Sequence, residues 1–378
     1  MKVFNTLSGK KENLVPIEEN KIKMYVCGMT VYDDTHIGHA RTFISFDLIV
    51  RYLRSINYEV HYIRNITDVD DKIIARAEEL NISPKELTEK YIDSMNEDFM
   101  SLGMIEPDSE PRATDNIDSI ISLIEILIEK GNAYEGDSDV YFSAESFDSY
   151  GKLSRRNLED MLAGARVDVD TDKKNPADFV LWKKNTEGLK WDSPWGAGRP
   201  GWHIECSAMS MDALGETFDI HGGGSDLKFP HHENEIAQSE CVTGKEFAKV
   251  WMHTGSLRID KEKMSKSLRN FVTIKDALEI NSPEVLRLFL ISSHYRSPLN
   301  YSEVGLNEAK NSLDRLYNSL QDLDYETKEY FQTKYSDKFH KAMGDDFNTP
   351  SAISVLFEIA RQINTLKKEN KFEEASLL

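Results

Sequence analysis

Two cysteines, a histidine and a glutamate could together hold one metal ion in this chain: Cys27, Cys206, His231 and Glu235. His231 and Glu235 are four residues apart, so on a helix their side chains lie on one side. Two thiolates, one imidazole and one carboxylate complete a tetrahedral shell, and the soft sulfur ligands favour Zn²⁺ over Mg²⁺. We interpret the set as a site for one zinc ion per chain, where an incoming thiolate could join the shell or displace the carboxylate.

Each of these residues also has an ordinary structural interpretation. A lone cysteine is usually a small buried hydrophobe, and we assign Cys241, which follows the expected ligand helix, to packing. His232 and Glu233 are rival ligands that we expect to face the other way on the same helix. Spacing alone leaves the choice between a metal site and core packing open.

His36 and His39 suit phosphate chemistry, because they flank Gly38 at the expected N-terminus of a helix. The glycine lets backbone approach a phosphate closely, and the helix end offers unpaired N–H donors. Imidazoles placed there can stabilise charge that develops on an α-phosphate. Two ordinary histidines at a helix start would give the same local pattern.

Lys263 and Lys266 stand three residues apart among serines in a segment without glycine. Mobile lysines suit a triphosphate, because charge moves onto the leaving pyrophosphate as the α-phosphorus is attacked. A solvated charged loop is the alternative. The sequence contains neither a Walker loop nor the dinucleotide glycine fingerprint, so the histidine and lysine motifs are its visible nucleotide site.

A glycine-rich loop is expected after a strand at 218–220, and it contains Gly222, Gly224 and Asp226. Glycines let adenine or ribose come close, and Asp226 could accept hydrogen bonds from ribose hydroxyls. A flexible turn would have the same composition.

The elements that must position these residues begin with a βαβ unit. We expect a strand at 22–27, a helix at about 40–56 and a second strand at 60–63. This order implies a parallel sheet with a right-handed crossover, and such sheets bind ligands at the carboxyl ends of their strands. Cys27, which ends the first expected strand, and the motif that begins at His36 lie at that location. Helices opening at 83–86 and spanning 117–130, and a hairpin at 133–142, come next.

The fold class that follows is α/β, with a Rossmann-like parallel-sheet domain, an α+β insertion and an α-helical bundle. We expect the catalytic domain over 1–255, interrupted by the insertion at about 110–200. The lysine motif lies in a segment at 256–305, and the bundle covers 306–378. The last residues look like the start of a helix, and we expect a further domain to be absent.

Composition narrows the class of protein. The 378 residues are 40% hydrophobic and 29% charged, as in globular proteins, and no apolar run is long enough to span a membrane. Three dispersed cysteines and a polar start predict a reduced, cytoplasmic protein. A net charge of −19, from 46 basic and 65 acidic residues, argues against a general polyanion binder without excluding a local basic track.

With these residues assembled, the chain closely resembles the cysteinyl-tRNA synthetase family of class I aminoacyl-tRNA synthetases. Both class signatures, the histidine motif and the lysine motif, are intact. The segments specific to that family are Tyr25–Asp33, Arg64–Lys72, Gly201–Cys206 and His221–Gln238. The likeness runs from the first residues to about 365.

The resemblance implies a cysteine–tRNA ligase. Cysteine would attack the α-phosphate of ATP, with Mg²⁺, to give cysteinyl-adenylate. The cysteinyl group would then pass to the 2′-hydroxyl of the terminal adenosine of tRNA(Cys). Carried over by position, the implied zinc ligands are Cys27, Cys206, His231 and Glu235, with the zinc binding the substrate thiolate. The other implied groups are His36 and His39 at the transition state, Lys263 and Lys266 at the pyrophosphate, Thr67, Trp202 and His221 in the cysteine pocket, and Gly38, Gly222, Gly224, Asp226 and Lys266 at the nucleotide.

The resemblance also sets expectations for partners. Family members continue into an anticodon-reading domain, so tRNA charging by this chain is expected to be inefficient, whereas adenylate formation should survive. We expect a monomer without an editing site, and stem contacts by residues near 291–296.

Two alternatives remain at this point. The mycothiol-pathway ligase shares this fold and chemistry but passes cysteine to a glucosaminyl-inositol amine; Asp70–Lys72 and Phe347–Pro350 fit the synthetase better. A non-catalytic zinc-binding RNA adaptor would be expected to lose signature residues, and here both histidines and both lysines remain.

Overall fold

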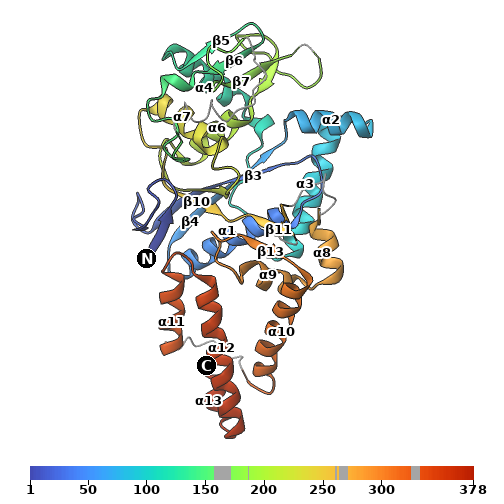
Figure 1. The fold of residues 1–378 in the computed structure, drawn as a ribbon, viewed down its shortest axis with the longest axis vertical. Helices are drawn as coiled ribbons and strands as arrows, with labels where there is room; N and C mark the ends of the chain where they lie inside the picture. The colour runs from blue at the N-terminus through green and yellow to red at the C-terminus, as the bar shows by residue number, and fades with distance from the viewer. Residues whose placement is uncertain (157–171, 186, 260–261, 264–270, 325–332) are drawn as a thin grey trace.

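A four-stranded parallel sheet forms the centre of the molecule (Figure 1). The computed structural model describes residues 1–156, 172–185, 187–259, 262–263, 271–324 and 333–378. The strands lie in the order β10-β9-β3-β4, and all neighbouring pairs are parallel. Their bounds are β3 (Lys21–Thr30), β4 (Glu59–Thr67), β9 (Phe218–Gly224) and β10 (Ala248–Thr254).

The predicted βαβ unit is confirmed, with helix α1 (Ile37–Ser55) connecting β3 to β4. The helix begins where the His36 side chain caps it, and its apolar stripe faces the sheet. That stripe is almost fully buried: Phe43, Phe46, Ile49, Val50 and Leu53. Burying each such side chain contributes roughly 1.5–3 kcal/mol, which fixes α1 against the sheet and places its N-terminus near the end of β3.

Two helices follow β4, namely α2 (Asp71–Leu80) and α3 (Pro84–Ser101). The predicted start of α3 is confirmed: the Ser83 hydroxyl accepts from Glu86 N, and the Glu86 carboxylate accepts from Ser83 N. Pro84 occupies the first turn, where no N–H partner is lost.

An antiparallel sheet, with strands in the order β5-β6-β7-β8, lies at one end of the molecule (Figure 1). Its hairpin and the preceding helix match the sequence prediction, whereas β7 and β8 were not predicted. One 3₁₀ turn, Ala113–Asn116, precedes α4, and another, Ala144–Ser146, follows β6. The bounds are α4 (Ile117–Glu129), β5 (Ala133–Glu135), β6 (Asp139–Phe142), β7 (Phe179–Lys184) and β8 (Gly198–Pro200).

Helices α6 (Trp202–Leu214) and α7 (His231–Thr243) lie between this antiparallel sheet and the parallel sheet. The proposed boundaries of the insertion, at about 110 and 200, remain a prediction.

The opposite end of the molecule is helical (Figure 1). A small sheet in the order β12-β11-β13 precedes it in the chain. The elements are β11 (Leu257–Ile259), β12 (Glu262–Lys263), α8 (Ile274–Ile280), α9 (Pro283–Ile291), β13 (Leu299–Tyr301), α10 (Glu303–Leu320), α11 (Lys334–Met343), α12 (Thr349–Lys368) and α13 (Phe372–Ser376). Helical structure after Tyr301 is as predicted in the described residues. Asn348 caps α12, because its side chain accepts from Ser351 N.

An N-terminal hairpin, β1 (Lys2–Asn5) and β2 (Lys10–Asn13), was not predicted. It meets the helical end at Asp346, which is fully buried between α11 and α12. The Asp346 carboxylate accepts from Phe4 N at 2.8 Å, from the Tyr295 hydroxyl at 2.8 Å and from Arg296 Nε at 2.7 Å. This Asp346 joint therefore ties together the hairpin, the segment after α9 and the helical bundle.

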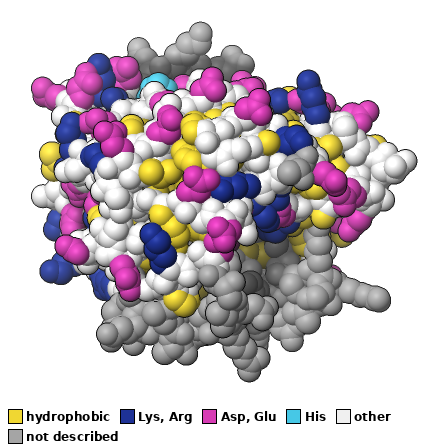
Figure 2. All heavy atoms as spheres, turned by 90° about the horizontal axis from the view of Figure 1, so that it is seen from above, with side chains coloured by type: hydrophobic (Ala, Val, Ile, Leu, Met, Phe, Trp, Pro, Cys, Tyr) yellow, Lys and Arg dark blue, Asp and Glu magenta, His cyan; other side chains and the backbone are white. Residues whose placement is uncertain are grey.

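The surface charge distribution and the hydrophobicity of the helices agree with the amino-acid composition. Figure 2 shows acidic and basic side chains interspersed with apolar ones over the described part of one face, the end that carries the antiparallel sheet. Among helices in the described ranges, none is both long enough and apolar enough to cross a membrane.

Candidate metal centre and active site

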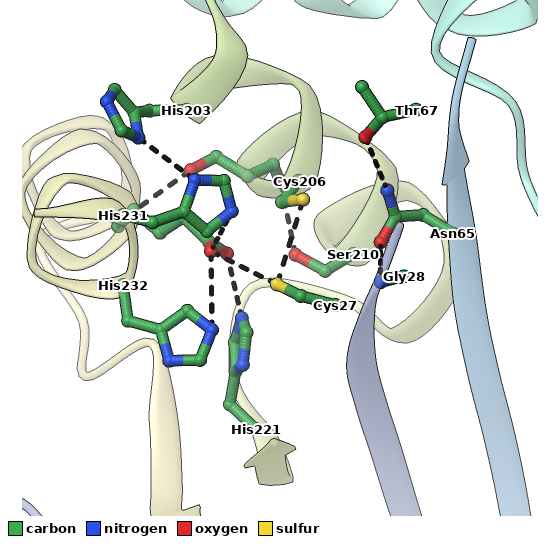
Figure 3. Close-up of polar contacts among 12 residues, drawn as sticks. Cys27, Gly28, Asn65, Thr67, His203, Cys206, Ser210, His221, His231 and His232 are labelled. Atoms are coloured by element: carbon green, nitrogen blue, oxygen red, sulfur yellow. Dashed lines mark hydrogen bonds and ion pairs between the residues drawn. The ribbon is translucent and has the colours of Figure 1, made fainter. Parts of the chain in front are cut away.

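The four predicted metal ligands converge, although more than 200 residues separate the first from the last. Figure 3 labels three of them, Cys27, Cys206 and His231, and shows their side chains gathered at one place. Cys27 comes from β3, Cys206 from α6, and His231 and Glu235 from the first turns of α7. One ligand atom from each lies within 4.8 Å of the others, and all four side chains are buried. The helix spacing predicted for His231 and Glu235 is confirmed.

Direct contacts hold this cluster together (Figure 3). Cys27 Sγ lies 3.8 Å from Cys206 Sγ and 3.4 Å from Glu235 Oε1. His231 Nε2 lies 3.1 Å from the same oxygen of Glu235. His231 Nδ1 is 3.0 Å from His203 Nδ1, so its Nε2 faces the cluster. Outer partners of this kind fix the orientation of a metal-binding imidazole.

The ionisable groups of the cluster shift one another's pKa values. Burial raises the pKa of Cys27 well above its usual range, and Cys206 and Glu235 add to the rise. A hydrogen bond with Cys27 is the largest influence that lowers the pKa of Cys206, to about 6, and His231 contributes. Burial alone would lower the pKa of His231, but Glu235 and Cys206 raise it to about 10. The groups thus share protons that a cation would displace.

A second set, comprising Cys27, His221, His232 and Glu235, also brings its ligand atoms within 4.8 Å of one another. The expectation that His232 faces away from the cluster is therefore wrong. Its Nε2 lies 4.0 Å from Glu235 Oε1, while its Nδ1 lies 2.9 Å from His253 Nε2. The reason is that α7 is buried on several sides, so both neighbouring histidines point inward.

Glu233 does face away, as expected, and accepts hydrogen bonds from Leu153 N and Ser154 N. Cys241 is partly buried against the core that includes α4, which confirms its packing assignment. Burial raises the pKa of its thiol to about 11.

The histidine motif forms the N-terminus of α1, as predicted. His36 Nδ1 accepts from Gly38 N at 3.1 Å and from His39 N at 3.2 Å. The rings of His36 and His39 stack with their centroids 3.6 Å apart. Burial, together with His36, lowers the pKa of His39 well below its usual value, so the neutral imidazole is favoured at this helix end.

The segment after the lysine motif lies against the histidine motif. Ile37 N donates to Val272 O at 3.2 Å, and Ile274 N donates to Thr35 O at 3.0 Å. Lys263 lies in β12, paired with Arg258 of β11, so its backbone belongs to a short strand rather than to a loop. Lys266 lies outside the described residues.

The prediction of a glycine-rich loop at Gly222 and Gly224 is wrong. Both residues belong to strand β9, which extends from Phe218 to Gly224. A Cβ on Gly222 would lie 2.4 Å from carbon atoms of the Phe46 ring, and one on Gly224 would lie 2.4 Å from Asp226 Oδ1. Gly222 is therefore needed for close packing of β9 on α1. Asp226 is exposed beyond the strand end.

Two of the residues expected in the cysteine pocket, His221 and Trp202, contact the cluster, and the third, Thr67, is linked to β3 through Asn65. His221 Nε2 lies 2.7 Å from Glu235 Oε2, and the Trp202 ring centroid lies 4.3 Å from that of His231. Thr67 ends β4 and is buried. Asn65 connects Thr67 to the ligand strand: its Nδ2 donates to Thr67 Oγ1, and its Oδ1 accepts from Gly28 N, as Figure 3 shows.

Sequence reasoning gave no role to His203, Asn65, His253 or Glu205, although two of them lie inside the motif around Cys206. Glu205 is 1% exposed, and neither carboxylate oxygen has a hydrogen-bond partner. Burial, with Cys206 and Asp68 nearby, raises the pKa of Glu205 well above its usual value. The position of Glu205 next to Cys206, a predicted metal ligand, is the feature of the sequence that could have identified it.

Comparison with known proteins decides the family. A model described as the tRNA synthetases class I (C) catalytic domain matches residues 13–311, and a DALR domain model matches residues 338–378. A cysteine–tRNA ligase from Marinomonas sp. is 58% identical over 381 residues, covering 100% of this chain and 82% of that protein. The chain belongs to the cysteine–tRNA ligase family. A cysteine–tRNA ligase from Hahella chejuensis is 55% identical over 384 residues, again covering 100% of this chain and 82% of the relative.

Solved structures confirm the fold expected of a cysteine–tRNA ligase. Mycobacterium tuberculosis methionyl-tRNA synthetase bound by methionyl-adenylate superposes with a TM-score of 0.73, covering 94% of this chain and 87% of that chain. Sequence identity is only 13%, so the similarity concerns the class I fold: a Rossmann-like parallel sheet followed by helices.

Proposed function

We propose that this chain activates L-cysteine with ATP and Mg²⁺ and then transfers the cysteinyl group to the terminal adenosine of tRNA(Cys). The family supplies the overall reaction, ligation of cysteine to tRNA. The observation that supports a cysteine-specific site is the convergence of Cys27, Cys206, His231 and Glu235. Their donors fit the preferences of zinc, because two sulfurs, one imidazole nitrogen and one carboxylate oxygen are available within bonding reach of one point.

Zinc held by these four residues would lower the pKa of a bound thiol and keep the substrate as a thiolate. Glu235 is the ligand best suited to give way to an incoming sulfur, because His221 already engages its other oxygen. Serine carries a hydroxyl that ionises far less readily, so the site discriminates between the two amino acids by one strong interaction. An editing site is therefore unnecessary in this proposal.

The nucleotide end of the reaction is assigned to the start of α1. His36 and His39 would face the α-phosphate, where the helix terminus and the imidazoles stabilise developing negative charge. Lys263 and Lys266 would hold the leaving pyrophosphate, and the contact between residues 272–274 and the histidine motif supports this arrangement. Gly38, Gly222, Gly224 and Asp226 would bound the nucleotide, with Asp226 at the ribose.

The molecule that accepts the cysteinyl group can be identified directly with this 378-residue chain. Labelled cysteine and ATP are supplied with a tRNA(Cys) transcript and, in parallel, with glucosaminyl-inositol. We expect label on the tRNA, because the relatives are cysteine–tRNA ligases. Label only on the sugar amine would refute the acceptor assignment and leave cysteine activation in place.

The metal assignment needs a separate measurement. We expect about one zinc ion per chain, and we expect Cys206→Ser to lose it together with discrimination against serine. Cys241→Ser is the matched control, since Cys241 packs away from the cluster. A metal-free chain that still selects cysteine over serine would refute the zinc site.

Two further parts of the proposal concern the protein in solution. We propose a monomer, which light scattering can check. We also propose that it acts in the cytoplasm, where its three free cysteines would stay reduced.

A further inference from the structure

A cavity of about 280 Å³ lies beside the metal cluster, between the antiparallel sheet and the first turns of α2 and α6. Its size approaches that of small-molecule sites. Trp202 and His203 line it from α6, and Lys183 and Arg199 line it from strands β7 and β8. His203 also contacts the cluster ligand His231, so the cavity and the cluster adjoin the same turn of α6.

Glu205 lines this cavity and is the unusual group in it. Its side chain is 1% exposed, and neither of its oxygens has a hydrogen-bond partner. A buried polar group without a partner costs about 1–3 kcal/mol, and more when it is charged. Glu205 follows Trp202 by three residues, so both share one face of α6, and it directly precedes Cys206. A donor that reached either oxygen of Glu205 through the cavity would supply the hydrogen bond that it lacks.

The charges around the cavity indicate whether the group that binds there is cationic or anionic. Its two cations are already engaged, because Lys183 Nζ lies 2.8 Å from Asp71 and Arg199 pairs with the same carboxylate. Asp70 and Asp139 add further carboxylates to the lining. An anionic ligand would therefore be repelled, whereas a cationic group would be attracted. ATP and tRNA are polyanions, so the α-ammonium group of cysteine is the cation that the organic substrates of this reaction offer.

We infer that Glu205 accepts the α-ammonium group of cysteine and so binds the amino acid at a third point. This inference rests on the proposed function. The thiolate lies at the Cys206 cluster, the carboxylate points to the phosphate end at His36, and the ammonium group lies against Glu205.

Two analogues of cysteine, each of which lacks one functional group, test the inference. Cysteamine carries the thiol and the amine, and 3-mercaptopropionate carries the thiol and the carboxylate. We measure the Kd of each by calorimetry with the native chain and with Glu205→Gln, and the KM for cysteine in ATP–pyrophosphate exchange. In the variant, the Kd of cysteamine and the KM for cysteine should rise roughly tenfold to a hundredfold, the loss expected for a hydrogen bond to a charged group. The Kd of 3-mercaptopropionate should stay within about twofold.

Glu233→Gln is the matched control, because Glu233 is equally buried on α7 but bonds to backbone N–H groups of the insertion. It should leave the ratio of the two Kd values unchanged. Zinc content is measured for each variant, since Glu205 adjoins a proposed ligand. If Glu205→Gln fails to fold, Glu205→Asp, which keeps the charge on a shorter side chain, should weaken cysteamine and spare 3-mercaptopropionate in the same way.

Three results would overturn the inference. Equal losses for both analogues would mean that Glu205 acts through the metal cluster, and no loss for either would mean that it does not contact the amino acid. A raised KM for tRNA alone would assign the cavity to the acceptor. If the native chain shows no cysteine-dependent exchange, the proposed function fails, whereas analogue binding still reports on Glu205.

Discussion

Replacing Asp346 by asparagine should destabilise the protein by about 2–3 kcal/mol, because it removes one buried charge from the Asp346 joint. The carboxylate is fully buried and accepts from Phe4 N, the Tyr295 hydroxyl and Arg296 Nε. An asparagine oxygen can still accept from Phe4 and Tyr295. Its amide nitrogen would then face Arg296 Nε, so two donors would meet where a charged pair existed.

The size of this destabilisation depends on how well water can solvate the partner that loses its ion pair. Removing one member of a buried ion pair typically costs about 3–5 kcal/mol. The Arg296 side chain is 32% exposed, so water can solvate the freed guanidinium and reduce the loss. Asp346 has a φ of +63°, in the left-handed region. Asparagine tolerates that conformation, whereas alanine would add backbone strain, so Asp346→Asn isolates the effect of the charge.

Urea denaturation, followed by tryptophan fluorescence and circular dichroism, measures the loss. Asp345→Asn is the control at the next position, since its side chain is 56% exposed and pairs with Lys11 on the surface; it should cost less than about 1 kcal/mol. Equal losses for the two variants would refute the view that Asp346 is a buried junction. An unaltered midpoint for Asp346→Asn would refute it as well.

Three further predictions concern the active site. His39→Ala should slow cysteine-dependent pyrophosphate exchange by about a hundredfold or more. The control is His61→Ala, at an exposed position of β4, which should leave the rate unchanged. An unchanged rate for His39→Ala would reject the role of His39 at the α-phosphate. Zinc affinity should rise about a hundredfold per pH unit between roughly pH 7 and 9, because two ligands must each release a proton to bind the metal. These ligands are Cys27, whose pKa is raised well above its usual range, and His231, whose pKa is raised to about 10. Competition with a chelator measures the slope, and a flat profile would contradict it. Gly222→Ala should lower the free energy of unfolding by about 1–3 kcal/mol through overpacking, since the added Cβ would lie 2.4 Å from the Phe46 ring. Adding Phe46→Leu should restore part of the lost stability, as measured by thermal unfolding. If stability is not restored, the clash with Phe46 is not the cause of the loss.

The sequence by itself determined several local elements and the identity of the chemical groups. The periods of apolar residues predicted β3, α1 and β4, and the capping box at Ser83 predicted the start of α3. These features depend on neighbouring residues, whose side chains and backbone groups interact within a few turns. The helix spacing of His231 and Glu235 belongs to the same category, as do the histidines at the start of α1.

Tertiary structure alone decided which distant groups meet. Cys27 and Cys206 are 179 positions apart, and spacing could not show that β3 and α6 place their sulfurs together. The same packing turned His232 inward, drew Gly222 into β9 against Phe46, and left Glu205 buried beside a cavity without a partner. The physical reason is that burial and pairing depend on what other segments supply at a point in space, whereas a residue's neighbours in the chain set only its local conformation.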